Sequence, residues 1–178
     1  MKNFFIILFL CMVVFVSTGS AQSPADGDFG SGATGSWTVA STWRIWNTAG
    51  GGWVTTTTKT APTSTDNVWI RGGFTVTYTT SGKTLKNLYI QSDGTLIGDI
   101  ANPTGSQRYL RVYGNVIQND GYMGVTAAAP NTWTNLCVED YFVGTTTWSG
   151  SGVTKVSRVR PGVAGTTLII DQDMTWTY

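Results

Sequence analysis

Few side chains in this sequence could do chemistry, and carboxylates come first among them. The chain has no His, which removes Ser-His-Asp and Cys-His catalysis and imidazole metal sites. The carboxylates form two local clusters, Glu139-Asp140 and Asp171-x-Asp173. On a strand, adjacent residues point to opposite faces, so Glu139 and Asp140 cannot act together directly. Asp171 and Asp173 would share a face and could bind Ca²⁺ weakly, although we favour a solvated turn.

Other reactive groups are equally sparse. The chain carries two Cys, and Cys11 lies in an N-terminal apolar run, so Cys137 has no partner for a disulfide or a thiolate cage. A P-loop, a G-x-S-x-G elbow and a dinucleotide fingerprint are all missing. Arg158 and Arg160 could supply the basic residue that a polysaccharide lyase would need, but nothing in the sequence brings them near carboxylates. We therefore predict no catalytic residue, no cofactor and no metal.

The elements that would position any site are short and repeated. Phrases of the form apolar-x-apolar start at Val68, Leu88, Leu110 and Leu136, which are 20, 22 and 26 residues apart, and a fifth starts at Leu168, 32 residues later. Self-similarity at such periods is typical of stacked repeats, in which each unit buries its apolar face against its neighbours. Each unit would be a strand, a turn with Gly and another strand. A β-sandwich is the competing interpretation, but its strands need not resemble one another.

Alternation within these phrases predicts which side chains face inward. An inner stack is expected from Val68, Ile70, Leu88, Ile90, Leu110, Val112, Leu136 and Val138. The intervening side chains would form an outer row of Trp69, Tyr89, Arg111 and Cys137. Asn67, Asn87 and Asn135 precede three of the phrases, and they indicate either a hydrogen-bonded Asn ladder or simple turn preference.

The N-terminal third contains three different segments. Lys2 followed by an apolar run of about 13 residues, with small residues up to Ala21, is typical of a cleavable signal peptide, because a membrane span needs about 20 residues. Residues 22–35 have linker composition and are expected to be a flexible lead-in. Residues 36–66 contain four Trp, which we interpret as a hydrophobic cap rather than a sugar-stacking platform.

Composition agrees with an exported all-β protein. The chain has 30 Thr and 22 Gly, which favour strands and turns respectively. After removal of residues 1–21, ten basic and ten acidic residues remain, so nothing suggests a nucleic-acid partner. The predicted fold is a right-handed parallel β-helix over 67–178, capped by 36–66. Because no closing signal follows Tyr178, the coils are expected to be truncated and to associate end to end.

Several motifs also resemble a known family. The stretches "ASTW", "PTSTDNVWIRGGFTVT", "LKNLYIQSDGTLIG" and "LRVYGNVIQNDGYMGV" are similar, in this order, to the opening β-helix of large secreted surface proteins of Bacteroidetes. Those proteins carry a C-terminal type IX secretion sorting domain, which this chain lacks, and "LCVEDYFVG" departs from the family pattern. The resemblance covers about residues 36–178 and implies export and a surface or adhesive role. It transfers no catalytic residues.

Three functions remain open on this basis. The preferred hypothesis is a non-catalytic structural or adhesion module, secreted or on the outer cell surface, with an extracellular polysaccharide or a host or cell-surface component as partner. The second is a carbohydrate-binding module in which Trp69, Tyr89 and Arg111 contact glycan, since strands spaced about 4.8 Å apart would align them in a strip. The third is a polysaccharide lyase or hydrolase, for which carboxylates would have to converge in a groove. No membrane span is expected after signal cleavage.

Overall fold

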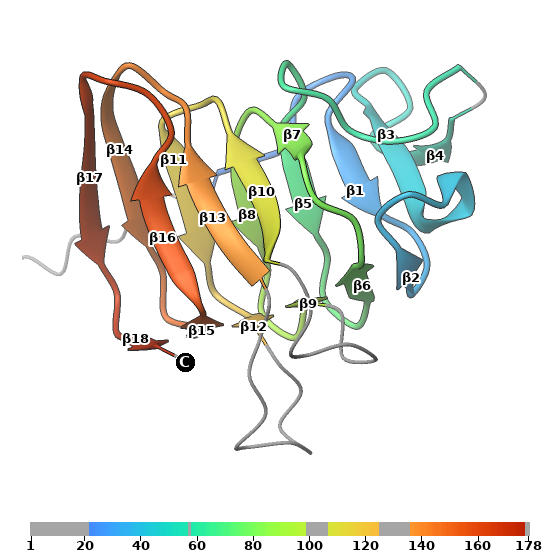
Figure 1. Ribbon diagram of the computed structural model, residues 1–178. Coiled ribbons are helices and arrows are strands. Elements are labelled where there is room, and N and C mark those ends of the chain that lie inside the picture. Colours follow the sequence, from blue (N-terminus) through green and yellow to red (C-terminus); the bar gives the residue numbers. More distant parts are fainter. Residues whose placement is uncertain (1–21, 57, 99–106, 125–135, 177–178) are drawn as a thin grey trace, which may run out of the picture.

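The computed structural model describes residues 22–56, 58–98, 107–124 and 136–176, and this part of the chain is all-β. Its strands form three sheets (Figure 1). Sheet A has the order β17 (Thr166–Asp171), β14 (Gly144–Ser149), β11 (Val116–Asn119), β8 (Leu88–Ile90), β5 (Val68–Ile70), β1 (Phe29–Ser31), β3 (Trp43–Asn47) and β4 (Gly52–Thr55). Sheet B has the order β18 (Met174–Trp176), β15 (Val153–Val156), β12 (Tyr122–Gly124), β9 (Thr95–Gly98), β6 (Thr75–Tyr78) and β2 (Gly35–Ser36). Sheet C has the order β16 (Arg158–Pro161), β13 (Leu136–Asp140), β10 (Arg108–Val112) and β7 (Lys83–Leu85).

From β5 onward the chain visits sheets A, B and C in turn, and it repeats this circuit up to β18. Each strand pairs in parallel with the strand one circuit earlier, as β8 does with β5 and β13 with β10. The short strands suit this arrangement because each carries only a few inward side chains before a turn. Sheet C lies in front of sheet A in Figure 1, with the strands of sheet B below them.

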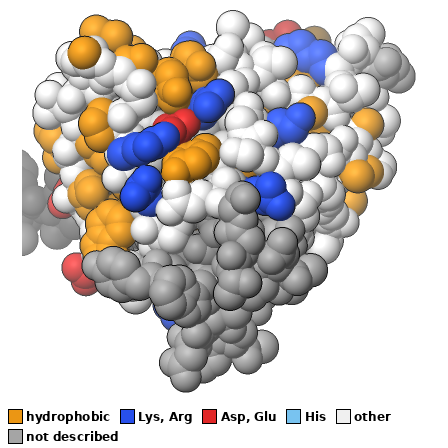
Figure 2. Space-filling model, in the orientation of Figure 1, with side chains coloured by type: hydrophobic (Ala, Val, Ile, Leu, Met, Phe, Trp, Pro, Cys, Tyr) orange, Lys and Arg blue, Asp and Glu red, His pale blue; other side chains and the backbone are white. Residues whose placement is uncertain are grey.

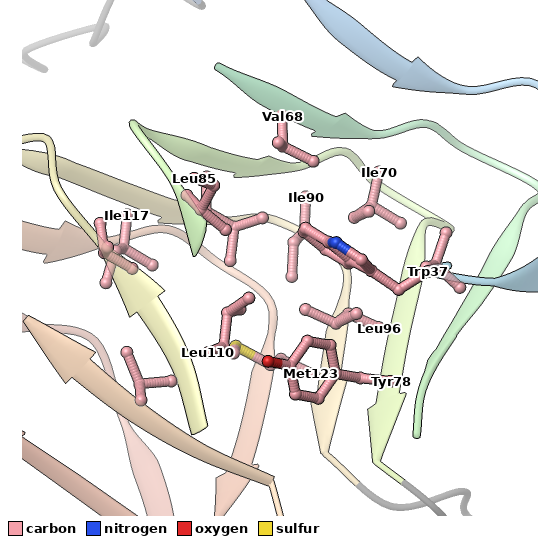
Figure 3. Close-up of a cluster of buried hydrophobic side chains, with 14 of the residues drawn as sticks. Trp37, Val68, Ile70, Tyr78, Leu85, Ile90, Leu96, Leu110, Ile117 and Met123 are labelled. Atoms are coloured by element: carbon pink, nitrogen blue, oxygen red, sulfur yellow. The ribbon is translucent and has the colours of Figure 1, made fainter. Parts of the chain in front are cut away.

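The core consists of columns of apolar side chains that run across the strands. One column in sheet A joins opposite residues of successive circuits, in the order Phe29, Val68, Leu88, Ile117, Trp148 and Ile170. All of these are fully buried except Ile170, which is 42% exposed. Sheet B contributes a matching column and sheet C another, and side chains from all three sheets meet in one cluster (Figure 3). Burial of these columns is the main stabilising contribution.

All eight side chains predicted for the inner stack are buried and belong to one apolar cluster, whereas the intervening Trp69, Tyr89 and Cys137 are also buried but lie outside that cluster. The predicted single stack is wrong, however. Val68 and Leu88 lie opposite each other in sheet A, whereas Leu110 and Val138 lie opposite each other in sheet C. A circuit contains three strands rather than two, and all three sheets bury one face. The same alternating phrase therefore arises on strands of all three sheets. An alignment by sequence similarity alone places strands of sheet A and strands of sheet C in one stack.

The N-terminal region is more ordered than its composition indicates. Strand β1 falls within residues 22–35, the expected flexible lead-in, and β2 begins at the last residue of that segment. Strand β1 pairs with both β5 and β3. The short 3-10 helix η1 (Ala40–Thr42) leads into the antiparallel hairpin β3–β4, which extends sheet A beyond β1. Backbone pairing thus outweighs the Gly-rich composition here, because β1 has a partner on each side.

Tryptophans of residues 36–66 lie over this end of the core. Trp37 and Trp43 are fully buried and meet edge to face with ring centroids 5.0 Å apart. The Trp43 indole N–H donates to the Trp37 carbonyl at 2.8 Å. Trp37 also meets Tyr78 of β6 at 5.7 Å. These contacts bury large aromatic area, which is what a cap requires.

An Asn ladder and a stack of Gly turns run from circuit to circuit. Asn87 donates its Nδ2 to Asn67 Oδ1 at 3.0 Å, which confirms the Asn ladder for this pair, whereas Asn135 lies outside the described residues. The ladder continues in both directions, since Asn67 donates to Asp28 and Asn87 accepts from the Val116 N–H.

In the turns between sheets A and B, a Cβ on Gly121 would meet the carbonyl oxygens of Gly94 and Gln91 in the preceding circuit. Only Gly allows the turns to stack this closely.

Candidate functional site

The outward side of sheet C carries charged and aromatic side chains in a regular grid. Strands β10, β13 and β16 present Tyr-x-Arg-x-Tyr, Cys-x-Glu-x-Tyr and Arg-x-Arg-x-Gly at matching positions. Backbone hydrogen bonds continue this register just beyond the strands, from the Tyr141 N–H to Val112 and from the Gly162 N–H to Asp140. We call this grid the Arg/Tyr face; its members are Tyr109, Arg111, Tyr113, Cys137, Glu139, Tyr141, Arg158, Arg160 and Gly162.

Glu139 is the centre of the grid. Its neighbours on the flanking strands are Arg111 and Arg160, which lie directly opposite it in register. Arg111 Nε donates to Glu139 Oε2 at 2.9 Å, and Arg160 Nε donates to Oε1 at 2.9 Å, with a second short bond from the Arg160 terminal nitrogen. The carboxylate is only 2% exposed, while the two Arg side chains are 38% and 46% exposed.

The protonation of Glu139 follows from these contacts. Burial alone would raise its pKa, but the hydrogen bonds and charges of Arg111 and Arg160 outweigh burial and lower the pKa below its usual range. Glu139 is therefore ionised at neutral pH and carries the charge that fixes both guanidinium groups. A buried carboxylate between two half-exposed Arg side chains leaves a net positive charge at the surface.

Tyrosines occupy both sides of the charged row. The rings of Tyr113 and Tyr141 stack with centroids 5.1 Å apart and an interplanar angle of 23°. The Arg111 guanidinium lies 5.4 Å from the Tyr141 ring centre, and that of Arg160 lies 4.7 Å from the Tyr109 ring centre. Such distances are within the range of cation–π attraction. Figure 2 shows the result on this side of the molecule, an acidic side chain between basic ones with apolar side chains nearby.

Cys137 and Arg158 complete the grid. Cys137 lies between Tyr109 and Arg158 in register and is fully buried, with its Sγ 3.0 Å from Ser157 Oγ. Burial raises the pKa of the Cys137 thiol, so it stays protonated and is a poor nucleophile at neutral pH. Arg158 is exposed and adds a further positive charge to the face.

The structure does not bring the three predicted glycan-contact residues together. Trp69 and Tyr89 do stack, with ring centroids 4.2 Å apart and an interplanar angle of 17°, on the outward side of sheet A. Their exposed fractions are only 3% and 4%. The Trp69 indole N–H donates to Asp28 of the N-terminal segment at 3.0 Å, and Gln22 lines the adjacent pocket of about 70 Å³. Arg111 lies on sheet C instead.

The carboxylate clusters are placed as the alternation predicts. Glu139 points outward, and Asp140 is 1% exposed on the inward side, so the two do not act together. Burial raises the pKa of Asp140 above its usual range. Asp171 and Asp173 are exposed at the end of β17 and after it. Within the described ranges no three acidic, Cys or His side chains gather in a way that could hold a metal ion.

Sequence reasoning missed the Arg/Tyr face, although a signal for it exists. The pattern Tyr109-x-Arg111-x-Tyr113 has the same period of two as Cys137-x-Glu139-x-Tyr141 and Arg158-x-Arg160-x-Gly162. These three segments become neighbours only when Arg111 is opposite Glu139, an offset of two residues from the alignment by first apolar residue. The sequence therefore predicts the grid only once each strand has been assigned to its sheet and register.

Comparison with family models, with curated proteins and with solved structures gave no significant match. Among the described residues, no helix has the length and apolar character needed to cross a bilayer.

Proposed function

We propose that this chain is a non-catalytic extracellular module, secreted or held at the outer cell surface, with a structural or adhesive role. In this proposal the stacked circuits are a right-handed parallel β-helix that acts as a rigid support for its outward faces. The order in which the chain visits sheets A, B and C, with parallel pairing throughout from β5 to β18, supports such a coil.

Two features of the sequence support an extracellular location. The first 21 residues have the charge and apolar pattern of a cleavable export signal. The order of motifs over about 36–178 also resembles that of secreted surface proteins of Bacteroidetes. The stability of such a protein without disulfides would come from backbone pairing between circuits and from the buried columns.

One observation carries the adhesive role, namely the register-matched Arg/Tyr face. Its exposed groups come from three different circuits, yet the buried Glu139 fixes two of its Arg side chains in one row. Long side chains held in a fixed geometry lose less conformational entropy on binding than mobile ones. A face of this kind suits recognition of an extended surface better than it suits chemistry on a bound substrate.

Carbohydrate binding is the second candidate function, and the Tyr residues favour it. Tyr113 is 38% exposed and stacks on Tyr141 beside two guanidinium groups. Aromatic rings next to fixed hydrogen-bond donors are the combination that sugars require, because sugars present both apolar ring faces and hydroxyl groups. The predicted strip of Trp69, Tyr89 and Arg111 is replaced by this face in the proposal.

A flow assay on protein-coated beads tests the proposed function. Beads that carry the purified protein should be retained on extracellular polysaccharide gels or cell layers, whereas albumin-coated beads should wash off. The polysaccharide recovered from the beads should show no new reducing ends and no unsaturated uronate groups. Beads that wash off like the albumin control, or end groups that accumulate with time, would contradict the proposal.

A further inference from the structure

We propose that the Arg/Tyr face binds an acidic polysaccharide, a polymer of uronate or sulfated sugars, along the direction in which the circuits stack. This inference rests on the proposed function as an extracellular binding module, and it names both the surface and the ligand class.

Charge is the first argument. The outward side chains of the three strands include Arg111, Arg158 and Arg160 against the single carboxylate of Glu139. Without residues 1–21 the whole chain is formally neutral, so the positive excess of this face does not reflect an excess in the chain as a whole. A guanidinium group presents a planar fork of donors that matches the oxygens of a carboxylate or a sulfate, and Arg is therefore suited to acidic sugars.

Orientation of the donors is the second argument. Glu139 takes one edge of each guanidinium through the Nε of Arg111 and the Nε of Arg160. Both Arg side chains nevertheless remain more than a third exposed. The carboxylate thus acts as a positioning residue that holds two cations toward solvent at a fixed spacing. Prior fixation of this kind reduces the entropic cost of binding.

Shape is the third argument. Arg111 and Arg160 lie on strands separated by one intervening strand, so their backbones are about 9.6 Å apart at the usual strand spacing. The row crosses three adjacent strands, with Tyr109 on one side and the Tyr113–Tyr141 pair on the other. Charges repeated along a line and bordered by rings suit a polymer with acidic groups along its length better than a single small anion.

Isothermal titration calorimetry with polygalacturonate tests this inference on the purified protein. An uncharged galactan of similar length, heparin and duplex DNA serve as comparison ligands. The variant Arg158→Gln/Tyr113→Ser removes a charge and a ring without touching the Glu139 ion pairs. Lys155→Gln on β15 of sheet B is the matched control, since it removes one positive charge from another face. Urea unfolding curves establish that each variant is folded.

The expected result is binding of polygalacturonate that weakens with added salt, with little binding of galactan. Arg158→Gln/Tyr113→Ser should weaken the affinity by about tenfold, and Lys155→Gln should leave it unchanged. Heparin binding as tight as that of polygalacturonate would also support the inference, because heparin is a sulfated acidic polysaccharide. Equal binding of galactan, equal loss in both variants, or tighter binding of DNA would overturn the inference.

The bead assay separates this inference from the proposed function. If beads are retained but polygalacturonate and heparin do not bind, the assignment of this face fails while the adhesive role stands. If the acidic polymers bind but beads wash off, the face is a ligand site and the adhesive role is wrong.

Discussion

At the scale of single residues, buried polar groups define the structure as much as apolar ones do. Asn87 links its own circuit to the two neighbouring ones by donating to Asn67 and accepting from the Val116 N–H. Glu139 and Asp140 are neighbours in sequence, but they lie on opposite sides of sheet C and their pKa values shift in opposite directions. The surroundings of each side chain, rather than its type, decide its protonation.

Replacement of Asn87 by Ala should destabilise the protein. The variant leaves the Val116 N–H and the side-chain oxygen of Asn67 (Oδ1) without their partner. This loss costs about 1–3 kcal/mol in the free energy of unfolding. Urea unfolding measures the change. Asn115→Ala, at an exposed turn position, is the control and should stay within about 0.5 kcal/mol of the wild type. Equal effects of the two substitutions would show that the ladder contributes nothing.

Asp140 should make stability depend on pH in a recognisable direction. Because its folded pKa lies above its unfolded pKa, the folded state is favoured at low pH and loses stability as pH rises through the folded pKa. Asp140→Asn cannot ionise, so its free energy of unfolding should increase relative to wild type as the pH rises above the usual pKa of an Asp carboxyl group. The contribution of Glu139, which is lost as pH falls through its lowered pKa, is common to both proteins. Parallel pH profiles would contradict the assignment.

At the scale of elements, the alternation in the sequence predicts which side chains face the core but not which sheet a strand joins. Val68 and Leu110 head similar phrases, yet one lies in sheet A and the other in sheet C. The information that separates them lies in the turns, whose lengths vary from circuit to circuit. Alternation and repetition made the all-β class and the parallel stacking predictable. The Arg/Tyr face was not predictable, because it requires the assignment of each strand to a sheet.

Stacked Gly turns are a feature of elements that mutation can test. Gly121→Ala would place a methyl group against the carbonyl oxygens of Gly94 and Gln91, and overpacking of this kind costs about 1–3 kcal/mol. Gly52, at the start of β4, has open space at the Cβ position and no left-handed backbone, so Gly52→Ala should be neutral or slightly stabilising. Thermal unfolding compares the two variants. A melting temperature for Gly121→Ala as high as that of Gly52→Ala would show that the turns do not stack tightly.

At the scale of the whole molecule, the two ends of the described sheets differ. Trp37 and Trp43 cover the core at the β1 end. At the other end β17 is the outermost described strand of sheet A, and its inward Ile170 is 42% exposed whereas Trp148 beside it is fully buried. An unpaired strand edge next to an exposed apolar column is a template for another strand.

This asymmetry predicts that a second copy of the chain pairs with the β17 edge. Sedimentation velocity should show association that increases with concentration. Ile170→Lys should weaken it, because the charge would be buried in the contact. Val143→Lys, at an exposed position between β13 and β14, should not. A protein that is strictly monomeric at high concentration would rule out this mode of association.

The Arg/Tyr face and the β17 edge both depend on the parallel register between circuits, and a pair of engineered cysteines tests that register most directly. Thr145 on β14 and Thr167 on β17 lie opposite each other and are both exposed. In a Cys137→Ser background, Thr145→Cys with Thr167→Cys should form an intramolecular disulfide on mild oxidation, detected by mass spectrometry after digestion, because opposed Cα atoms lie within bridging distance. Thr147→Cys with Thr167→Cys, displaced by two residues, should remain reduced. A disulfide in the displaced pair and none in the opposed pair would contradict the stacking on which the fold and both proposals rest.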